Sequence, residues 1–191
     1  MENMVMQLQQ YYKNKKVFVT GPNGFKGSWL TAILYSLNAE IKGYALKPEY
    51  IDGLYETLQP CINIQSVIAD IRDKKNLQKE IEIFQPDYIF HLAAQPPVRR
   101  SYEIPAETFD VNVTGTANVL EAAINLKNKC TVVIITTDKV YENEEDNSIL
   151  YVEDDILGGY DPYSASKACA ELVISSFRNS FFNVKNFDAH Q

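Results

Sequence analysis

Three glycines follow a short apolar run in the stretch Val17-Phe18-Val19-Thr20-Gly21-Pro22-Asn23-Gly24-Phe25-Lys26-Gly27. The apolar run predicts a strand over residues 16–20, and the residues after the turn predict a helix over residues 25–37. Phosphate oxygens need backbone N–H donors at close range and the positive end of a helix dipole, which such a turn provides. Glycine also lets the backbone approach a ligand closely or adopt a positive φ. The stretch therefore predicts a phosphate-binding turn for a dinucleotide, formed by Gly21, Asn23, Gly24, Phe25 and Gly27.

The spacing of these glycines is GxxGxxG rather than the commoner GxGxxG, and the pattern alone is weakly specific. A loop with incidental glycines between a strand and a helix remains the alternative interpretation. Pro22 has no N–H group, so it cannot donate to a phosphate itself.

Further strands and helices alternate along the rest of the chain. Strands are predicted over residues 40–46, 65–69, 88–92 and 131–136, and helices over residues 76–84, 107–126 and 162–177. The helix over 25–37 carries Trp29, Leu30, Ile33 and Leu37 at helical spacing, and the acidic residues 143–155 predict a surface loop. Apolar strands separated by helices indicate an α/β fold with a doubly wound parallel sheet, a Rossmann fold, covered by helices on both faces.

Polar residues follow several of these strands. Ligands of a doubly wound sheet bind beyond the carboxyl ends of the strands, so these residues are expected to converge on one crevice. Asp70 and Ile71, after the third strand, suit a contact to the adenine amino group, although Asp70 could equally cap a helix or a loop. Leu92, Ala93, Ala94 and Gln95, after the fourth strand, complete the expected cofactor site.

The acidic residue that usually ends the second strand and binds the adenosine ribose is missing. The sequence there is Tyr44-Ala45-Leu46-Lys47. This position therefore does not decide between NAD and NADP.

Tyr163 and Lys167 lie four residues apart in the last predicted helix. A free tyrosine has a pKa near ~10 and is a poor base at neutral pH. A cation one helical turn away favours the phenolate, so we expect Lys167 to lower the pKa of Tyr163. A surface Tyr and Lys on an amphipathic helix is the alternative. Together with the glycine turn, the pair indicates a nicotinamide-dependent enzyme that acts on an alcohol.

Thr137, Asp138 and Lys139 end the fifth predicted strand, where a substrate would bind. Thr137 could hydrogen-bond a substrate hydroxyl, although β-propensity alone could explain a threonine there. Asp138 and Lys139 place two opposite charges after a strand expected to be buried. If the strand continued through them, their side chains would point to opposite sides and would not pair.

Composition limits the other possibilities. The 191 residues suffice for one sizeable domain, and the net charge of −7 argues against binding to nucleic acid. No apolar run is long enough to span a membrane, and residues 1–16 lack the apolar centre of a secretory signal. We expect a polar extension over residues 1–14 and a dinucleotide-binding domain over residues 15–191.

The cysteines are odd in number and far apart: Cys61, Cys130 and Cys169. The only histidines are His91 and His190, so neither a metal site nor a disulfide framework is expected. A reducing, cytoplasmic location fits this cysteine usage.

Several motifs between residues 15 and 182 occur together. They are residues 21–27, His91-Leu92-Ala93-Ala94-Gln95-Pro96, Val98-Arg99-Arg100-Ser101-Tyr102, Asn112-Val113-Thr114-Gly115-Thr116, Asp138-Lys139, Tyr141-Glu142-Asn143, and Gly158-Gly159-Tyr160-Asp161-Pro162-Tyr163 followed by Lys167. In these motifs the chain resembles the extended short-chain dehydrogenase/reductases. Within them it is most similar to the 4,6-dehydratases that act on CDP-glucose, because related dTDP-glucose and GDP-mannose dehydratases have Asp-Glu where this chain has Asp138-Lys139.

The resemblance implies a reaction with tightly held NAD. Tyr163 would take the proton of the sugar 4-hydroxyl, Lys139 would remove the C5 proton, and Asp138 would protonate the departing 6-hydroxyl. It also implies a homodimer formed through helices such as 107–126 and 162–177. Family members carry a further C-terminal part that holds most nucleotide-sugar contacts, and this part is expected to be missing here. An epimerase, a reductase or a catalytically silent cofactor-binding fragment remain alternatives.

Overall fold

The computed structural model describes residues 2–48, 52–142 and 150–182. The chain divides into two compact units, and each is described by itself. The first unit comprises Met1–Ala93 and Glu121–Ile135, and the second comprises Ala94–Leu120 and Thr136–Gln191. Within the described residues, no helix combines the length and apolar character needed to cross a membrane. Of the acidic segment predicted to form a loop, residues 143–149 lie outside the described residues, as does Asn143 of the family motif.

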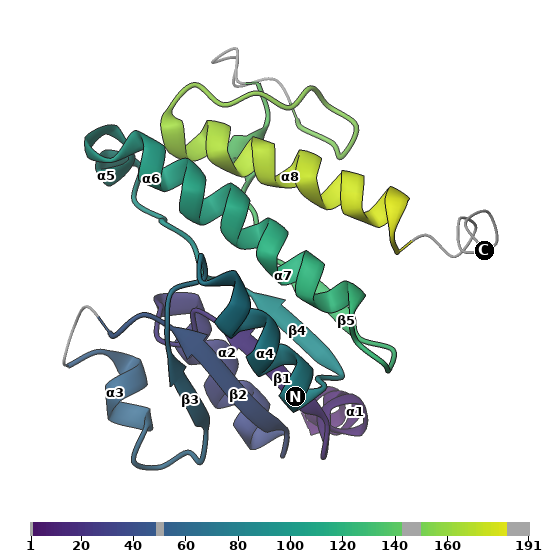
Figure 1. Cartoon of the computed structure of the whole chain (residues 1–191). Helices are drawn as coiled ribbons and strands as arrows, with labels where there is room; N and C mark the ends of the chain where they lie inside the picture. Colours follow the sequence, from purple (N-terminus) through teal and green to yellow (C-terminus); the bar gives the residue numbers. More distant parts are fainter. Residues whose placement is uncertain (1, 49–51, 143–149, 183–191) are drawn as a thin grey trace. The chain divides into compact units, whose positions relative to one another are not determined.

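The first unit is built on a parallel sheet. Its strands are β1 (Lys16–Thr20), β2 (Glu40–Ala45), β3 (Gln65–Ile68), β4 (Tyr88–His91) and β5 (Thr131–Ile134). Their order in the sheet is β3-β2-β1-β4-β5, and every neighbouring pair is parallel (Figure 1). This confirms the doubly wound parallel sheet predicted from the sequence. β1 has the predicted bounds, and each of the other strands ends one or two residues earlier than predicted.

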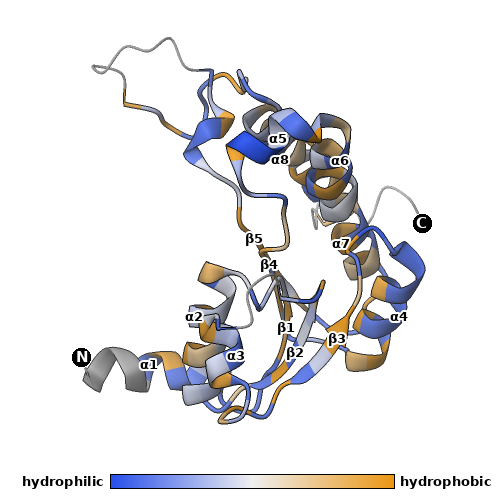
Figure 2. Ribbon diagram, turned by 90° about the vertical axis from the view of Figure 1, so that its left-hand side faces the viewer, coloured by the Kyte–Doolittle hydropathy of each residue, from blue (hydrophilic) through white to orange (hydrophobic). Residues whose placement is uncertain are grey.

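Helices cover both faces of this sheet, which is why the central strand β1 is buried on both sides. Helices α2 (Phe25–Ser36) and α3 (Leu54–Leu58) lie on one face and α4 (Lys74–Phe84) lies on the other (Figure 2). On the α2 face, Val17, Val19 and Ile41 pack with Leu34. On the α4 face, the ring of Phe18 lies 6.3 Å from that of Phe84, between ring centroids.

The buried face of α2 differs from the one that the apolar spacing suggested. Trp29 and Ile33 are about half exposed, at 54% and 50%, whereas the small residues Ser28 and Thr31 are buried. Small side chains let the helix pack closely against the sheet and the glycine turn, because Gly27 leaves no room for a Cβ beside Gly21. Close packing therefore outweighs the burial of the larger apolar residues here.

The second unit is helical. Its elements are α5 (Val98–Glu103), α6 (Pro105–Phe109), the π-helical η1 (Asp110–Thr114), most of α7 (Gly115–Ile124), the 3₁₀ turn η2 (Asp138–Val140) and α8 (Pro162–Ser180). Helix α8 packs against α5, α6, η1 and η2. The carboxylate of Asp161 caps α8, accepting from the Ser164 backbone N at 3.0 Å and from its Oγ at 2.6 Å, and Pro162 occupies the first turn.

Two predicted elements are corrected by the structure. The single helix predicted over residues 107–126 is three consecutive segments, because the backbone changes to π-helical geometry over η1. The strand predicted to continue to residue 136 ends at Ile134, so Asp138 and Lys139 lie on the η2 turn and not on a strand. Among the described residues, the α-helices α1 (Glu2–Tyr12), α3 and α5 were not predicted from the sequence.

Candidate cofactor and catalytic site

The glycine turn after β1 has no space for larger residues. Gly21 has a φ of +70°, and a Cβ built there would lie 2.9 Å from the backbone N of Ala93. A Cβ on Gly27 would collide with the carbonyl oxygen of Gly21. Glycine is therefore required at both positions, because only glycine combines the positive φ with this close approach of two backbone segments.

The beginning of α2 offers unpaired donors to an anion. The helix has no side-chain cap and no acidic residue in its first turn. The backbone N of Ser28 donates to Gly24 O at 2.9 Å, and within the described residues no partner accepts from the N–H groups of Phe25, Lys26 and Gly27. These donors, with the helix dipole, suit the diphosphate of a dinucleotide.

Thr20 connects this turn to the end of β4, a role that the sequence did not indicate. Its buried Oγ1 lies 2.7 Å from His91 Nδ1 and accepts from the backbone N of Leu92 and of Ala93, each at 3.2 Å. Because the hydroxyl has one proton and already accepts twice, it donates to His91 Nδ1. The loop with Leu92 and Ala93 is thereby fixed beside Gly21.

The loop after β3 is also held in place. Both carboxylate oxygens of Asp70 accept from Arg72, including its backbone N at 2.8 Å and its Nη2 at 2.6 Å. Hydrogen bonds from the Arg72 side chain lower the pKa of Asp70 below its usual value. The hydroxyl of the buried Tyr44 donates to the backbone oxygen of Asp70 at 3.1 Å, and Ile71 is buried. The contact of Asp70 with an adenine stays a prediction, and Arg72 already orients the carboxylate.

In the second unit, the structure brings together three of the predicted catalytic side chains. Thr137 precedes the η2 turn, and its hydroxyl donates to Asp138 Oδ1 at 3.0 Å. Tyr163, at the beginning of α8, lies close enough to Thr137 for the threonine hydroxyl to lower the pKa of its phenol. Lys139 is exposed and lies on the same turn, where its backbone N donates to Thr137 Oγ1 at 3.4 Å. Although Asp138 and Lys139 are adjacent, no ion pair joins these two described residues.

The pKa of Tyr163 is raised above its ordinary value of 10.0. Burial of the phenol is the largest cause, the Thr137 hydroxyl opposes it, and the carboxylates of Asp138 and Asp161 raise the pKa further. The expectation of a pKa lowered by Lys167 is therefore wrong for this structure. The spacing of Tyr163 and Lys167 on α8 is confirmed, but spacing does not report how far the phenol is removed from water.

A buried polar network connects α8 to η1 and to the loop before α5. Asn112, in the middle of η1 and 1% exposed, donates from Nδ2 to Ser166 Oγ at 2.8 Å. Its Oδ1 accepts from the backbone N of Gln95 at 2.8 Å, and Ser166 Oγ donates to the carbonyl oxygen of Tyr163 at 2.7 Å. Lys167 is also buried, with 6% of its surface exposed. The sequence analysis missed this network because it depends on the π-helical geometry at Asn112, which apolar periodicity does not indicate.

The predicted site residues fall in both units. The first unit holds the phosphate turn and the loops after β3 and β4: Gly21, Asn23, Gly24, Phe25, Gly27, Asp70, Ile71, Leu92 and Ala93. The second unit holds the remaining cofactor residues and the catalytic ones: Ala94, Gln95, Thr137, Asp138, Lys139, Tyr163 and Lys167.

The sequence matches the family described as GDP-mannose 4,6 dehydratase over residues 18–185. It is 48% identical over 182 residues to the CDP-glucose 4,6-dehydratase of Salmonella typhimurium. This match covers 95% of this chain and 50% of that protein. It is 30% identical to the dTDP-glucose 4,6-dehydratase of the same organism, covering 87% of this chain and 51% of that protein. The chain thus spans about half the length of the curated relatives it matches.

Solved structures agree with this assignment. The dTDP-glucose 4,6-dehydratase of Streptomyces venezuelae, solved with NAD and TYD bound, is similar with a TM-score of 0.75 and 28% identity. That match covers 87% of this chain and 52% of the solved chain. The chain therefore belongs to the GDP-mannose 4,6 dehydratase family, within the extended short-chain dehydrogenase/reductases.

Proposed function

We propose that this chain carries the NAD-binding and catalytic residues of a CDP-glucose 4,6-dehydratase, which converts CDP-glucose to CDP-4-keto-6-deoxyglucose and water. The observation that carries the proposal is that Thr137 and Asp138, which share a hydrogen bond, both lie near enough to Tyr163 to shift the pKa of its phenol, with Lys139 on the same turn. The Asp-Lys pair and the 48% identity to a CDP-glucose 4,6-dehydratase support CDP-glucose as the substrate.

Residues of the first unit would hold the cofactor. The donors at the beginning of α2 fit its diphosphate, and Asp70 and Ile71 follow β3 where an adenine would lie. When bound, NAD would accept a hydride from the sugar C4 and later return it to C6. The structure of a related dehydratase solved with NAD supports this cofactor.

Each catalytic residue has a separate role in the proposed reaction. Tyr163 accepts the proton of the 4-hydroxyl during oxidation, and Lys167 lies one turn along the same helix. The resulting ketone acidifies the proton on C5, which Lys139 removes. Asp138 donates a proton to the 6-hydroxyl, which leaves as water.

Further parts of the proposal concern the whole protein. We propose a cytoplasmic enzyme of deoxysugar and surface-polysaccharide synthesis that works as a homodimer. Residues 15–191 would form its cofactor-binding domain after a short extension over residues 1–14. Contacts to the CDP group would come from a part that corresponds to the half of the Salmonella enzyme's length not matched by this chain.

The direct test incubates the chain with NAD and CDP-glucose and measures the alkali-labile keto sugar. We expect product from CDP-glucose in preference to dTDP-glucose, UDP-glucose and GDP-mannose. Product of an epimerisation, or equal turnover of all four, would contradict the proposal.

Two variants separate the steps. Lys139→Ala is expected to permit oxidation of the 4-hydroxyl, seen as NADH absorbance, but to block exchange of the C5 proton with D₂O. Tyr163→Phe is expected to abolish both. A Lys139→Ala variant that exchanges C5 at the wild-type rate would remove Lys139 from the base role.

A second candidate is a cofactor-binding fragment without catalysis. The observation that favours it is that the match covers only 50% of the CDP-glucose 4,6-dehydratase of Salmonella typhimurium. Loss of remote substrate contacts reduces turnover because binding energy no longer orients the sugar. Purified chain that binds NADH but yields no product with any of the four nucleotide sugars would favour this candidate.

A further inference from the structure

A cavity of about 370 Å³ lies beside the phosphate turn, between α3 and the sheet. Its floor is one face of β2 and β3, because Gly43 is paired with Ser66 and Ala45 with Ile68. Gly43 has no side chain to fill the cavity, and a Cβ there would lie 2.8 Å from the ring of Pro22. The cavity is therefore bounded by the phosphate turn and by the carboxyl ends of the two strands that flank a cofactor's adenosine in this fold.

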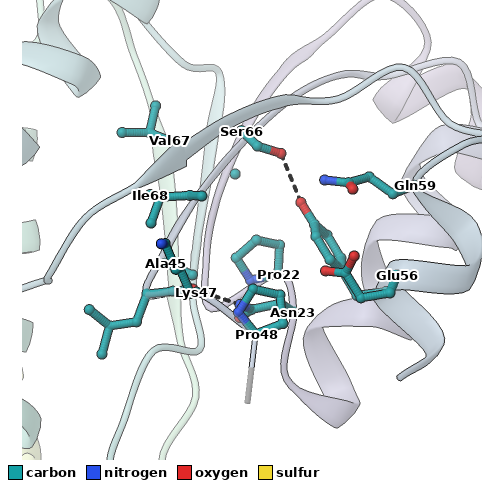
Figure 3. A pocket seen from close by; sticks show the side chains of 13 residues that line it. Pro22, Asn23, Ala45, Lys47, Pro48, Glu56, Gln59, Ser66, Val67 and Ile68 are labelled. Carbon is teal, nitrogen blue, oxygen red and sulfur yellow. Dashed lines mark hydrogen bonds between the residues drawn. The ribbon is translucent and has the colours of Figure 1, made fainter. Parts of the chain in front are cut away.

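The polar groups of this cavity differ in whether they have partners. The hydroxyls of Tyr55 and Ser66 are hydrogen-bonded to each other at 2.8 Å, and Asn23 Nδ2 donates to Leu46 O at 2.7 Å. Glu56 supplies the one carboxylate in the lining and Lys47 the one ammonium. Within the described residues, neither charge has a hydrogen bond or an ion pair. Figure 3 shows Glu56 of α3 and Gln59, directly after this helix, with Pro22 and Asn23 of the phosphate turn nearby.

The end of β2 lacks the acidic residue that usually binds the ribose of NAD. Ala45, Leu46 and Lys47 occupy this segment, and none of them can accept a hydrogen bond through a carboxylate. We propose that Glu56, from α3, binds the 2′-hydroxyl of the adenosine ribose and thereby selects NAD over NADP. This inference rests on the proposed function, because it assumes that a nicotinamide dinucleotide occupies the phosphate turn.

The charge of Glu56 accounts for the selectivity. A carboxylate accepts a hydrogen bond from a hydroxyl, whereas it repels a 2′-phosphate and cannot bond to it without a shared proton. Lys47 would favour the phosphate, but its side chain is exposed and its charge is screened by water and salt. Glu56 is partly buried, so its charge is screened less and determines the preference.

The test measures binding rather than activity. Dissociation constants for NADH, NADPH and 2′-deoxy-NADH are measured by fluorescence with the full chain and with Glu56→Gln. A hydrogen bond to a charged group corresponds to roughly a tenfold change in affinity or more, so the wild type is expected to bind NADH at least about 10-fold more tightly than 2′-deoxy-NADH. Glu56→Gln is expected to reduce this difference, because an amide oxygen still accepts from the hydroxyl but carries no charge, and to bind NADPH more tightly than the wild type does.

Gln59→Ala is the matched control, because it changes an uncharged side chain in the same wall of the cavity. It is expected to leave the ratio of NADH to NADPH affinity unchanged. Wild-type chain that binds 2′-deoxy-NADH as tightly as NADH would overturn the inference without any variant, and the proposed function would stand. Failure of the wild type to bind NADH at all would overturn both.

Discussion

Two buried threonines of the first unit, Thr20 and Thr31, differ in what their hydroxyl groups contact. Both are 0% exposed. Thr20 Oγ1 contacts His91 and two backbone N–H groups, whereas Thr31 Oγ1 has no hydrogen-bond partner within the described residues. An unpaired buried hydroxyl costs free energy, whereas a paired one satisfies groups that would otherwise be unpaired. The same substitution is therefore expected to have opposite effects at the two sites.

Thr20→Val is expected to lower the free energy of unfolding by about 1–3 kcal/mol, because the backbone N–H of Ala93 loses its acceptor, whereas that of Leu92 keeps the Thr20 carbonyl oxygen. Urea denaturation measures this change. NADH affinity is also expected to fall, since the loop beside Gly21 is no longer fixed. Wild-type stability for Thr20→Val would show that the hydroxyl does not hold this loop.

Thr31→Val is the matched control, with the same change of a hydroxyl to a methyl group. It is expected to leave the free energy of unfolding unchanged or to raise it, because an unpaired polar group is removed from the interior. A loss as large as that of Thr20→Val would contradict the assignment of Thr31 as unpaired.

The influence of the Thr137 hydroxyl on Tyr163 gives a prediction for the pKa of the phenol. Burial raises this pKa and Thr137 lowers it, so Thr137→Val is expected to raise it further. Thr137→Ser retains the hydroxyl and is expected to keep the wild-type pKa. Ultraviolet difference titration, with Tyr163→Phe subtracted, follows the single phenol. A pKa that is equal in the valine and serine variants would mean that the hydroxyl does not act on the phenol.

At the level of elements, the π-helical η1 allows one buried amide to connect three segments. Asn112 bonds the Gln95 backbone, which leads into α5, and Ser166 of α8. π-helical turns inside α-helices are rare and occur often at functional sites. In this chain the turn directs Asn112 toward the helix that carries Tyr163.

Asn112→Ala is expected to destabilise the protein by about 1–3 kcal/mol, since it leaves a buried backbone N–H of Gln95 without an acceptor. Thr114→Ala, at an exposed position of the same turn, is the control and is expected to change stability by less than about 0.5 kcal/mol. Thermal unfolding of both variants measures the difference. Equal midpoints would show that the amide network contributes nothing to stability.

The sheet was predictable from the sequence because β1, β4 and β5 are mainly apolar and are bounded by turn residues. β1 was predicted to the residue, and Gly21 and Gly27 marked the turn that the structure confirms. The helices α3 and α5 were not predictable, because five or six residues give no readable period. Their sequences, Leu54–Leu58 and Val98–Glu103, are helical through tertiary packing rather than propensity.

The candidate site was predictable in its residue types but not in its electrostatics. The spacing of Tyr163 and Lys167 correctly placed both on one helix. Burial then raised the pKa of the phenol, and burial depends on segments far apart in the sequence. Glu56 was not found because it belongs to α3, which the sequence did not predict. The missing acid after Ala45 was the only sequence signal for it.

At the level of the whole molecule, groups with shifted pKa values set the pH range of stability. At the acid end, Asp70 has a lowered pKa because of its hydrogen bonds with Arg72. Its contribution is present above the ordinary carboxyl pKa and is lost as the pH falls through the lower, folded value. At the alkaline end, Tyr44 is buried and its pKa is raised to about 12, with burial as the largest cause. Stability is therefore expected to decline at both ends.

The contribution of Tyr44 to the alkaline decline can be separated from that of Tyr163 and Cys130, whose pKa values burial also raises. Between about pH 10 and the folded pKa of about 12, the phenol of Tyr44 ionises in the unfolded chain but not in the folded one, so stability falls with a limiting slope of roughly 1.4 kcal/mol per pH unit. Tyr44→Phe cannot ionise, and we expect a shallower decline in this range, measured by urea denaturation at successive pH values. At neutral pH the variant loses the bond to Asp70 O and is expected to be about 1 kcal/mol less stable, so the two curves converge as the pH rises.

Tyr160→Phe, at a fully exposed ring, is the control and is expected to follow the wild-type curve. If Tyr44 stays neutral in the folded protein, the wild-type curve must be steeper than that of Tyr44→Phe. Parallel curves would therefore mean that the alkaline decline does not come from Tyr44.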